Sequence, residues 1–242
     1  METTTEIKPK KTVKNRSLTN DRLQPKNQLK AQTSNLKRVM EICRLAQEDS
    51  LFIALIAETS QGKTFGFNEY EITNENVYKV EITPSMTPKQ FYLELQRKLH
   101  LESVNSKGSL WYLIEKNAQS LWELKKKSLV IVDEAGNFKK GMHKYIRELR
   151  DKTKGFCGII MSGPGYFKKN MTDWEKEGYP GVPEVMSRIN HWITLKKHNI
   201  NDVRKICALY NITDEDFINQ CDQYNYLSKI FDEVWKYLKI NN

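Results

Sequence analysis

The chain has 242 residues, of which 39% are hydrophobic and 29% are charged, and its formal net charge at pH 7 is +9. This length allows one substantial α/β domain with a small accessory unit, and the hydrophobic fraction is ordinary for a folded soluble protein. We expect no membrane association and no secretory signal, because no apolar run approaches the length of a membrane span and the start of the chain is charged.

The four cysteines and four histidines are scattered along the chain, and no C-x-x-C pair occurs. This distribution indicates neither a disulfide framework nor a zinc site, so we expect a reduced, cytoplasmic protein. The basic surplus favours an acidic polymer as partner, with nucleic acid the first candidate. A solubilising surface without a partner would explain the charge equally well.

Residues 1–33 lack apolar periodicity and carry eight basic residues against three acidic ones. This composition predicts a mostly disordered basic arm. The arm could contact phosphates without sequence preference, hold a neighbouring subunit, or be a solvated tail.

Order is expected to begin near Ser34, where apolar residues recur at helical spacing. Strands are predicted at 51–58, 77–82, 128–134, 156–161 and 191–195, of which 51–58, 128–134 and 156–161 are expected to be buried. Helices are predicted before 51 and from about 62, 87, 109 and 141, with further helices after 199. The pair Thr87 and Gln90 predicts a capping box, whereas Asn201 and Thr213 are expected to begin the last helices. Residues 167–183 receive no assignment.

The segment 51–64, LFIALIAETSQGKT, joins an apolar strand to a loop that ends in Gly-Lys-Thr. It matches the phosphate-binding pattern G-x-x-x-x-G-K-[ST], except that Ala57 replaces the first glycine. In such a loop, backbone N–H groups surround a phosphate, the lysine reaches the β- and γ-phosphates, and the threonine hydroxyl binds Mg²⁺. A chance Gly-Lys-Thr at a turn is the alternative, which the preceding strand disfavours. The predicted nucleotide-binding residues are Ala57, Glu58, Thr59, Ser60, Gln61, Gly62, Lys63 and Thr64.

Two carboxylates end the apolar run 128–134, SLVIVDE. A continuous apolar run predicts a central parallel strand, and ligands bind at the carboxyl ends of such strands. Asp133 would hold Mg²⁺ together with Thr64, and Glu134 would polarise the attacking water. Adjacent carboxylates can also simply begin a helix or lie on the surface.

Two further polar residues are candidates for catalysis. If the strand that ends at Ser162 lies beside the Asp133 strand, the serine could hydrogen-bond the γ-phosphate or the water; an ordinary turn serine is the alternative. Arg188, just before the last strand, could reach a nucleotide held by a neighbouring subunit and act as an arginine finger. The alternative is a surface arginine.

Together these motifs resemble the AAA+ ATPases, and within them the transposition regulators of the Mu B, TnsC and TniB type. The resemblance covers about residues 36–238 and rests on AETSQGKT, LVIVDEAG, KYIRELRD leading into GFCGIIMSGPGYF, and VMSRI. It implies an α/β P-loop NTPase fold in which helices flank a parallel sheet. The nucleotide-binding domain would span 34–197, and a small C-terminal α-helical lid would span 198–242.

The resemblance also implies that ATP and Mg²⁺ bind between subunits, and that the chain is an ATPase. The family assembles into rings or helical filaments on duplex DNA and recruits or stimulates a DDE transposase. The family's loop, acidic-pair, sensor and finger positions fall on Lys63, Thr64, Asp133, Glu134, Ser162 and Arg188, and its lid sensor on Lys229. Ser162 stands where many members have asparagine, which implies slow turnover. No separate N-terminal helix-turn-helix unit is evident, and the basic arm could take its place.

DNA would be held through its backbone, without strong sequence preference and with a steep salt dependence. The candidate DNA-binding residues are Lys107, Lys139, Lys140 and Lys144. Each of these lysines could equally be a solvated surface residue. Two other hypotheses remain open: a helicase-loader ATPase acting in replication, and a nucleotide-gated DNA-binding scaffold with negligible hydrolysis.

Overall fold

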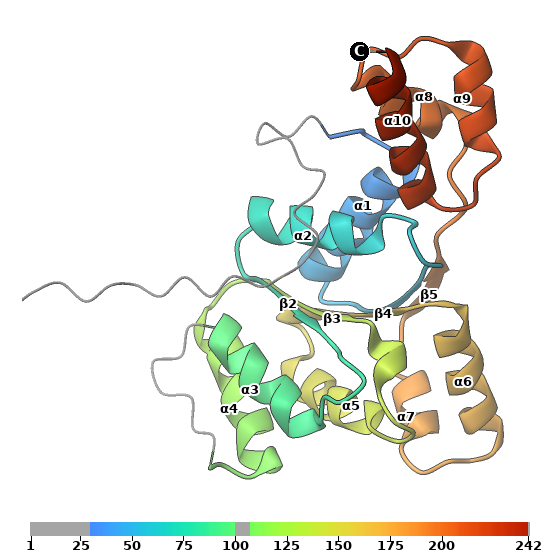
Figure 1. Cartoon of the computed structure of the whole chain (residues 1–242). Helices are drawn as coiled ribbons and strands as arrows, with labels where there is room; N and C mark the ends of the chain where they lie inside the picture. The colour runs from blue at the N-terminus through green and yellow to red at the C-terminus, as the bar shows by residue number, and fades with distance from the viewer. Residues whose placement is uncertain (1–29, 100–106, 242) are drawn as a thin grey trace, which may run out of the picture. The chain divides into compact units, whose positions relative to one another are not determined.

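The computed structural model describes residues 30–99 and 107–241 (Figure 1). Most of the predicted basic arm and most of the polar loop before residue 108 lie outside these ranges. The described arm residues end at Thr33, whose side chain accepts a hydrogen bond from the Leu36 N–H and caps the first helix. No helix in the described part of the chain is long and apolar enough to cross a membrane.

A five-stranded parallel sheet has the strand order β2-β3-β4-β1-β5. The strands are β1 Phe52–Ile56, β2 Val77–Glu81, β3 Ser128–Asp133, β4 Cys157–Gly163 and β5 His191–Thr194. The three central strands are buried along their whole length, as their continuous apolar runs predict. The predicted parallel α/β fold is therefore confirmed. The fourth strand continues through Ser162 to Gly163, beyond its predicted end at residue 161.

Helices cover both faces of the sheet (Figure 1). On one face lie α1 Ser34–Glu48 and α2 Lys63–Thr73, packed on alternate strand residues such as Ile53 and Leu55. The other face holds α3 Pro88–Lys98, α4 Leu110–Glu123, α5 His143–Thr153, α6 Gly165–Lys176 and α7 Val182–Met186. Because successive side chains of a strand point to opposite faces of the sheet, the side chains of β1 are divided between two hydrophobic clusters.

Three further helices follow β5: α8 Ile200–Ala208, α9 Glu215–Asp222 and α10 Leu227–Asn241. They pack around a hydrophobic cluster of their own, which includes Val203, Ile218 and Ile230. A helical C-terminal segment was predicted; its division from a nucleotide-binding domain at residues 197 and 198 stays a prediction.

The helix starts show which local signals were informative. The capping box of Thr87 and Gln90 at the start of α3 is confirmed. The cap predicted at Asn201 is wrong, because the Asn199 side chain accepts from the N–H groups of Asn201 and Asp202. Asn201 therefore lies inside the first turn of α8.

The start predicted at Thr213 is displaced by one residue, since Asp214 caps α9 by accepting from the Phe217 N–H. The unassigned stretch 167–183 contains most of α6 and the start of α7. The residue before helix α6, Pro164, has no side chain that can cap the helix, which removes the usual sequence signal. Its apolar residues Phe167, Met171 and Trp174 do recur at helical spacing.

Helix α1 packs so closely on β4 that only glycine fits at residue 158. A Cβ atom placed on Gly158 would lie 2.0 Å from the Ala46 carbonyl oxygen and 2.5 Å from its carbon. Both are backbone atoms, so the helix itself would have to move.

We therefore expect Gly158→Ala to lower the free energy of unfolding by at least about 2 kcal/mol. Gly155→Ala is the matched control, because a Cβ there meets no atom within 4 Å and only its φ of +96° is unfavourable. That control should lose about 1 kcal/mol. Urea unfolding of both variants measures the difference, and equal losses would contradict the predicted clash.

Candidate functional site

The phosphate-loop sequence connects β1 to α2 and lines a cavity of about 530 Å³. Gly62 adopts a left-handed φ of +82° immediately before α2 begins at Lys63. The first N–H groups of α2 lack intrahelical partners, and its positive dipole end lies at the loop, as an anion site requires. The cavity walls are residues 57–65 together with Glu134, Pro164 and Tyr166.

Ala57, the departure from the loop pattern, is buried and is not among the described residues with positive φ. Its N–H donates to the Gly163 carbonyl at 3.0 Å, so residue 57 extends the sheet contact between β1 and β4. An alanine satisfies this conformation, because the freedom of glycine is needed only at positive φ.

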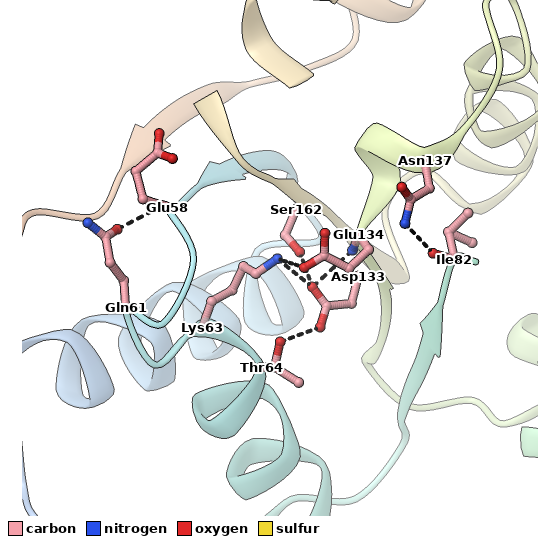
Figure 2. Close-up of polar contacts among 9 residues, drawn as sticks. All are labelled: Glu58, Gln61, Lys63, Thr64, Ile82, Asp133, Glu134, Asn137 and Ser162. Atoms are coloured by element: carbon pink, nitrogen blue, oxygen red, sulfur yellow. Dashed lines mark hydrogen bonds and ion pairs between the residues drawn. The ribbon is translucent and has the colours of Figure 1, made fainter. Parts of the chain in front are cut away.

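The loop lysine meets both carboxylates that follow β3 (Figure 2). Lys63 Nζ lies 2.7 Å from Glu134 Oε1 and 3.0 Å from Asp133 Oδ1. Burial lowers the pKa of Lys63, but the charge of Asp133 and the hydrogen bonds to both carboxylates outweigh burial and raise it above 10.5. The lysine is therefore fully charged at neutral pH.

Asp133 is a buried carboxylate held by side-chain donors from two elements, α2 and β4 (Figure 2). Ser162 Oγ donates at 2.6 Å and Thr64 Oγ1 at 2.9 Å. Burial raises the pKa of Asp133, but the Lys63 charge and the hydrogen bonds from Ser162, Lys63 and Thr64 together hold it below 3.8. The structure thus confirms that β4 lies beside β3, and it places Ser162 directly on Asp133.

Glu134 occupies an unusual backbone position. Its φ of +55° lies in the left-handed region, which non-glycine residues seldom adopt. A short 3₁₀ helix, η1 Ala135–Asn137, follows immediately. This sharp turn directs the Glu134 side chain toward Lys63 and away from the continuation of β3 (Figure 2).

The residues present fit a nucleotide with Mg²⁺. The Thr64 hydroxyl and the Asp133 carboxylate are adjacent hard oxygen donors, and Mg²⁺ typically takes one or two protein oxygens together with phosphate oxygens. Among the described residues, no group of three or more His, Cys, Asp or Glu side chains is placed so that it could hold a metal ion by itself. The loop, lysine and cavity match a triphosphate in charge and size.

Three contacts at the cavity were not predicted. Glu58 Oε1 accepts from the Gly165 N–H at 3.2 Å, so a carboxylate of the loop caps α6. Asn35 Nδ2 donates to the carbonyls of Gln61 and Lys196, which ties α1 to the loop and to the end of β5. No sequence pattern signals such long-range contacts, because each joins residues from separate segments.

The last helix begins against the phosphate loop. The Leu227 N–H donates to the Ser60 carbonyl at 3.3 Å, and the hydroxyls of Ser60 and Ser228 are 2.9 Å apart. Lys229, the candidate lid sensor, is exposed in the first turn of α10. Its role as a nucleotide sensor stays a prediction.

Arg188 does not join these residues. Its Nε lies 3.0 Å from Asp151 Oδ1, and its side chain is 41% exposed. The neighbouring Asn190 pairs with Phe52 at the start of β1, whereas the phosphate loop follows the end of β1. Arg188 thus lies at the opposite edge of the parallel sheet from the cavity of its own chain, and its proposed role in a neighbouring site remains untested.

Two of the four DNA-binding candidates line a second cavity, of about 440 Å³, which we call the basic groove. Lys140 and Lys144 line it, and Lys139 is exposed next to Lys140. Lys107 is exposed three residues before Leu110, which also lines the groove. The groove residues are Thr87, Pro88, Lys89, Leu110, Lys140, Gly141, Met142, Lys144, Tyr145, Tyr179 and Pro180.

The groove combines cations with aromatic rings. Lys140 Nζ lies 4.5 Å from the centre of the Tyr179 ring and 2.5 Å from Glu177 Oε2. Lys144 Nζ lies 5.2 Å from the Tyr145 ring. Lys89 also lines the groove but was not predicted as a DNA-binding residue. The predicted cap at Thr87 places this lysine in the first turn of a helix.

A family model described as AAA domain matches residues 46–171, which is more than half of the chain. The chain belongs to the AAA domain family. The matched range contains the phosphate loop and both carboxylates, so the AAA P-loop fold predicted from these motifs is confirmed.

Two phage proteins, each described as ATP-dependent target DNA activator B, are similar to this AAA protein. The protein of Escherichia phage D108 is 24% identical over 194 residues, which is 79% of this chain and 59% of the phage protein. That of Escherichia phage Mu is 25% identical over 186 residues, or 76% and 57% of the two chains. The chain therefore spans less than two thirds of either relative. The predicted resemblance to Mu B is confirmed.

Solved structures show the same fold at low identity. The Aeropyrum pernix ORC1 protein in complex with DNA has a TM-score of 0.54 and 15% identity, covering 78% of this chain and 53% of that one. Cdc6p from Pyrobaculum aerophilum has a TM-score of 0.56 and 13% identity, covering 76% and 51%. These likenesses concern the fold of the AAA protein alone.

The hydrogen bond from Ser162 to Asp133 should make the stability of the folded protein depend on pH. Removing the donor with Ser162→Ala should destabilise the protein by about 2 kcal/mol at pH 7, because the bond is made to a charged group. The pKa of Asp133 in the folded protein lies below the ordinary value of 3.8. The charged carboxylate therefore contributes its full stability above about pH 4, and this stability is lost as the pH falls through the folded pKa. The destabilisation by Ser162→Ala should therefore shrink below about pH 4.

Urea unfolding at pH 7, 5 and 3 measures this dependence. Ser120→Ala is the matched control, because the nearly buried Ser120 hydroxyl donates to an uncharged carbonyl, that of Lys116, at 2.8 Å. Its effect should be smaller and constant with pH. A Ser162→Ala effect that stays the same at all three pH values would argue against the charged acceptor.

Proposed function

We propose that this AAA protein is a DNA-binding ATPase that assembles on duplex DNA when ATP is bound and recruits or stimulates a transposase. Binding would occur without sequence preference, as expected for contacts to the DNA backbone. The observation that carries the ATPase assignment is the convergence of Lys63, Thr64, Asp133, Glu134 and Ser162 at the carboxyl edge of three adjacent strands.

Each of these residues has a role that its contacts support. Lys63 and the loop N–H groups would bind the β- and γ-phosphates. Thr64 and Asp133 would hold Mg²⁺, which neutralises phosphate charge. Ser162 would keep the Asp133 carboxylate ionised and oriented, a more specific role than contact with the γ-phosphate or water.

Glu134 would act as the general base that orients the attacking water. Its side chain is one-third exposed and paired with Lys63, and it can leave that pair because Lys63 keeps the carboxylate of Asp133 as a partner. Transfer of the terminal phosphoryl group to water would then give ADP and phosphate. Turnover is expected to be slow.

The DNA and transposition assignments draw on two independent supports. The relatives from phages D108 and Mu are named as ATP-dependent activators of target DNA, although this chain spans only part of each. Within this chain, the basic groove offers lysine ammonium groups beside aromatic rings, which suits a polyanion. Self-association into a ring or filament would bring Arg188 of one copy to the cavity of the next.

Assembly on DNA provides the test of function. With ATP, electron microscopy should show rings or filaments on duplex DNA, and with ADP it should show none. Affinity for duplexes of unrelated sequence should agree within about twofold and fall steeply with salt. Lone monomers with both nucleotides would contradict the proposal. Preference for single-stranded DNA would instead indicate a helicase loader.

Glu134→Gln separates assembly from hydrolysis in the same assay. The variant should keep ATP-dependent assembly and lose at least about 100-fold in phosphate release, because a missing general base costs two to four orders of magnitude. Lys63→Ala should also lose phosphate release, since the phosphates lose their cation. Equal phosphate release by the parent and Glu134→Gln would remove Glu134 from the mechanism and favour a scaffold with negligible hydrolysis.

The trans role of Arg188 is testable by mixing subunits. Arg188→Ala alone and Lys63→Ala alone should each be inactive in phosphate release. A mixture should recover activity only at interfaces that pair an intact loop with an intact Arg188, here the loop of Arg188→Ala with the finger of Lys63→Ala. Recovery near one quarter of the parent rate is expected from random mixing of equal amounts. No recovery at any ratio would count against a finger supplied by the neighbour.

A further inference from the structure

The turn after β3 lies between the two cavities along the chain. Glu134 lines the nucleotide cavity, and Lys140, only six positions later, lines the basic groove. Within this short span, two side chains tie the turn to the segments that form the groove. They are Asn137, at the end of η1, and His143, at the start of α5.

Asn137 ties the turn to the end of β2 (Figure 2). Its Nδ2 donates to the Ile82 carbonyl at 2.8 Å, and the Ile82 N–H donates to the Asp133 carbonyl at 2.8 Å. Ile82 is therefore bound on both sides to the segment that carries the two carboxylates. Five residues later, Thr87 begins the first wall of the groove. A shift of the turn would be transmitted to this wall through the backbone.

His143 ties the turn to the second wall. Its Nε2 lies 3.1 Å from the Ala135 carbonyl, and the ring is packed among Phe138, Phe167 and Trp174. Burial lowers the pKa of His143 to about 4, so the ring is neutral at pH 7. Because a carbonyl only accepts, Nε2 carries the proton, and the buried Nδ1 has no hydrogen-bond partner.

The residues on either side of His143 belong to the groove. Met142 and Lys144 both line it, and the Lys144 side chain also limits the space at Gly181, where a Cβ would lie 2.9 Å from the Lys144 Cβ. The histidine thus connects the carbonyl next to Glu134 with a rigidly packed part of the groove. The bond spans eight residues of sequence and lies entirely in the protein interior.

The turn itself has little freedom to absorb a displacement. Glu134 holds a left-handed φ, and a Cβ on Gly136 would lie 2.9 Å from the Tyr166 ring. Tyr166 also lines the nucleotide cavity. A closely packed turn of this kind moves as a unit rather than by local deformation.

We infer that Asn137 and His143 are positioning residues that couple the nucleotide cavity to the basic groove, so that the nucleotide bound at one changes DNA affinity at the other. The inference rests on the proposed function, because it takes ATP and duplex DNA as the two ligands. When the phosphates take Lys63 and Glu134 turns to the attacking water, the turn shifts, and the two hydrogen bonds carry the shift to both groove walls. Coupling is reciprocal, so DNA in the groove also favours the ATP-bound turn.

The test measures the coupling itself. The dissociation constant for a duplex is determined with a non-hydrolysable ATP analogue and with ADP, and the ratio of the two values is compared among variants. The parent chain should show at least about a fivefold ratio, the lower end of ordinary allosteric coupling. Asn137→Ala and His143→Phe should bring it below about twofold, while affinity for the analogue without DNA changes less than about threefold.

The variants are chosen so that packing is retained. His143→Phe keeps an aromatic ring among its neighbours, and the Ala135 carbonyl still accepts from the Phe138 N–H. Asn137 is half-buried and tolerates truncation. Should His143→Phe fail to fold, Asn137→Ala carries the test alone. His143→Gln restores an amide donor and should recover part of the ratio that His143→Phe loses.

Asn74→Ala is the matched control for the asparagine. Its Nδ2 also donates to a backbone carbonyl, that of Tyr70 at 3.1 Å, but it does so at the end of α2 and has no link to the groove. This control should keep the parent ratio. A merely structural role for Asn137 and His143 would weaken both ligands and leave the ratio unchanged, and that result would overturn the inference.

The outcomes also separate this inference from the proposed function. A parent ratio that survives in both Asn137→Ala and His143→Phe overturns the coupling and leaves the DNA-dependent function standing. A parent chain that binds duplex DNA equally with both nucleotides, or not at all, overturns the two together. Loss of the ratio in both variants, with the Asn74 control intact, supports the assignment.

Discussion

The site depends on one buried negative charge. A carboxylate as deeply buried as Asp133 would be strongly disfavoured without compensation. The fold supplies that compensation with three side chains from two elements: the ammonium of Lys63 and the hydroxyl of Thr64 at the start of α2, and the hydroxyl of Ser162 at the end of β4. Satisfying this one group therefore fixes the positions of β3, β4 and α2 relative to each other, and these are the elements that a nucleotide site needs.

Parallel strands explain why these groups meet. In a parallel sheet all carboxyl ends share one edge, so a loop after β1, a carboxylate after β3 and a hydroxyl after β4 are adjacent although they are far apart in sequence. The same geometry puts Arg188, which precedes β5, at the other edge. Only a second copy of the chain can bring the two edges together, which makes self-association a chemical requirement of the proposed finger.

Sequence patterns predicted the parts of the site that follow local rules. The apolar runs identified the five strands, and the phosphate-loop pattern together with Glu134 at the end of an apolar run predicted residues that line the cavity. They could not show that Lys63 pairs with Glu134, because that contact depends on a left-handed backbone at a glutamate. Asn137 and His143 were likewise missed, since an asparagine in a turn and a lone histidine carry no signal until their backbone partners are known.

Glu58 offers a similar lesson: the loop pattern predicted nucleotide binding at this position and carries no signal that the carboxylate accepts from the Gly165 N–H at the start of α6. The contact between Ser60 and the start of α10 has a mechanical consequence. The 15 residues of that helix form a rod of about 22 Å, anchored at one end to the loop. If α8, α9 and α10 tilt together, as their shared hydrophobic cluster requires, a tilt of about 10° at the anchor would move the far end of α10 by about 4 Å. A small tilt of α10 at the phosphate loop thus produces a displacement as large as a side chain at the other end of the helix.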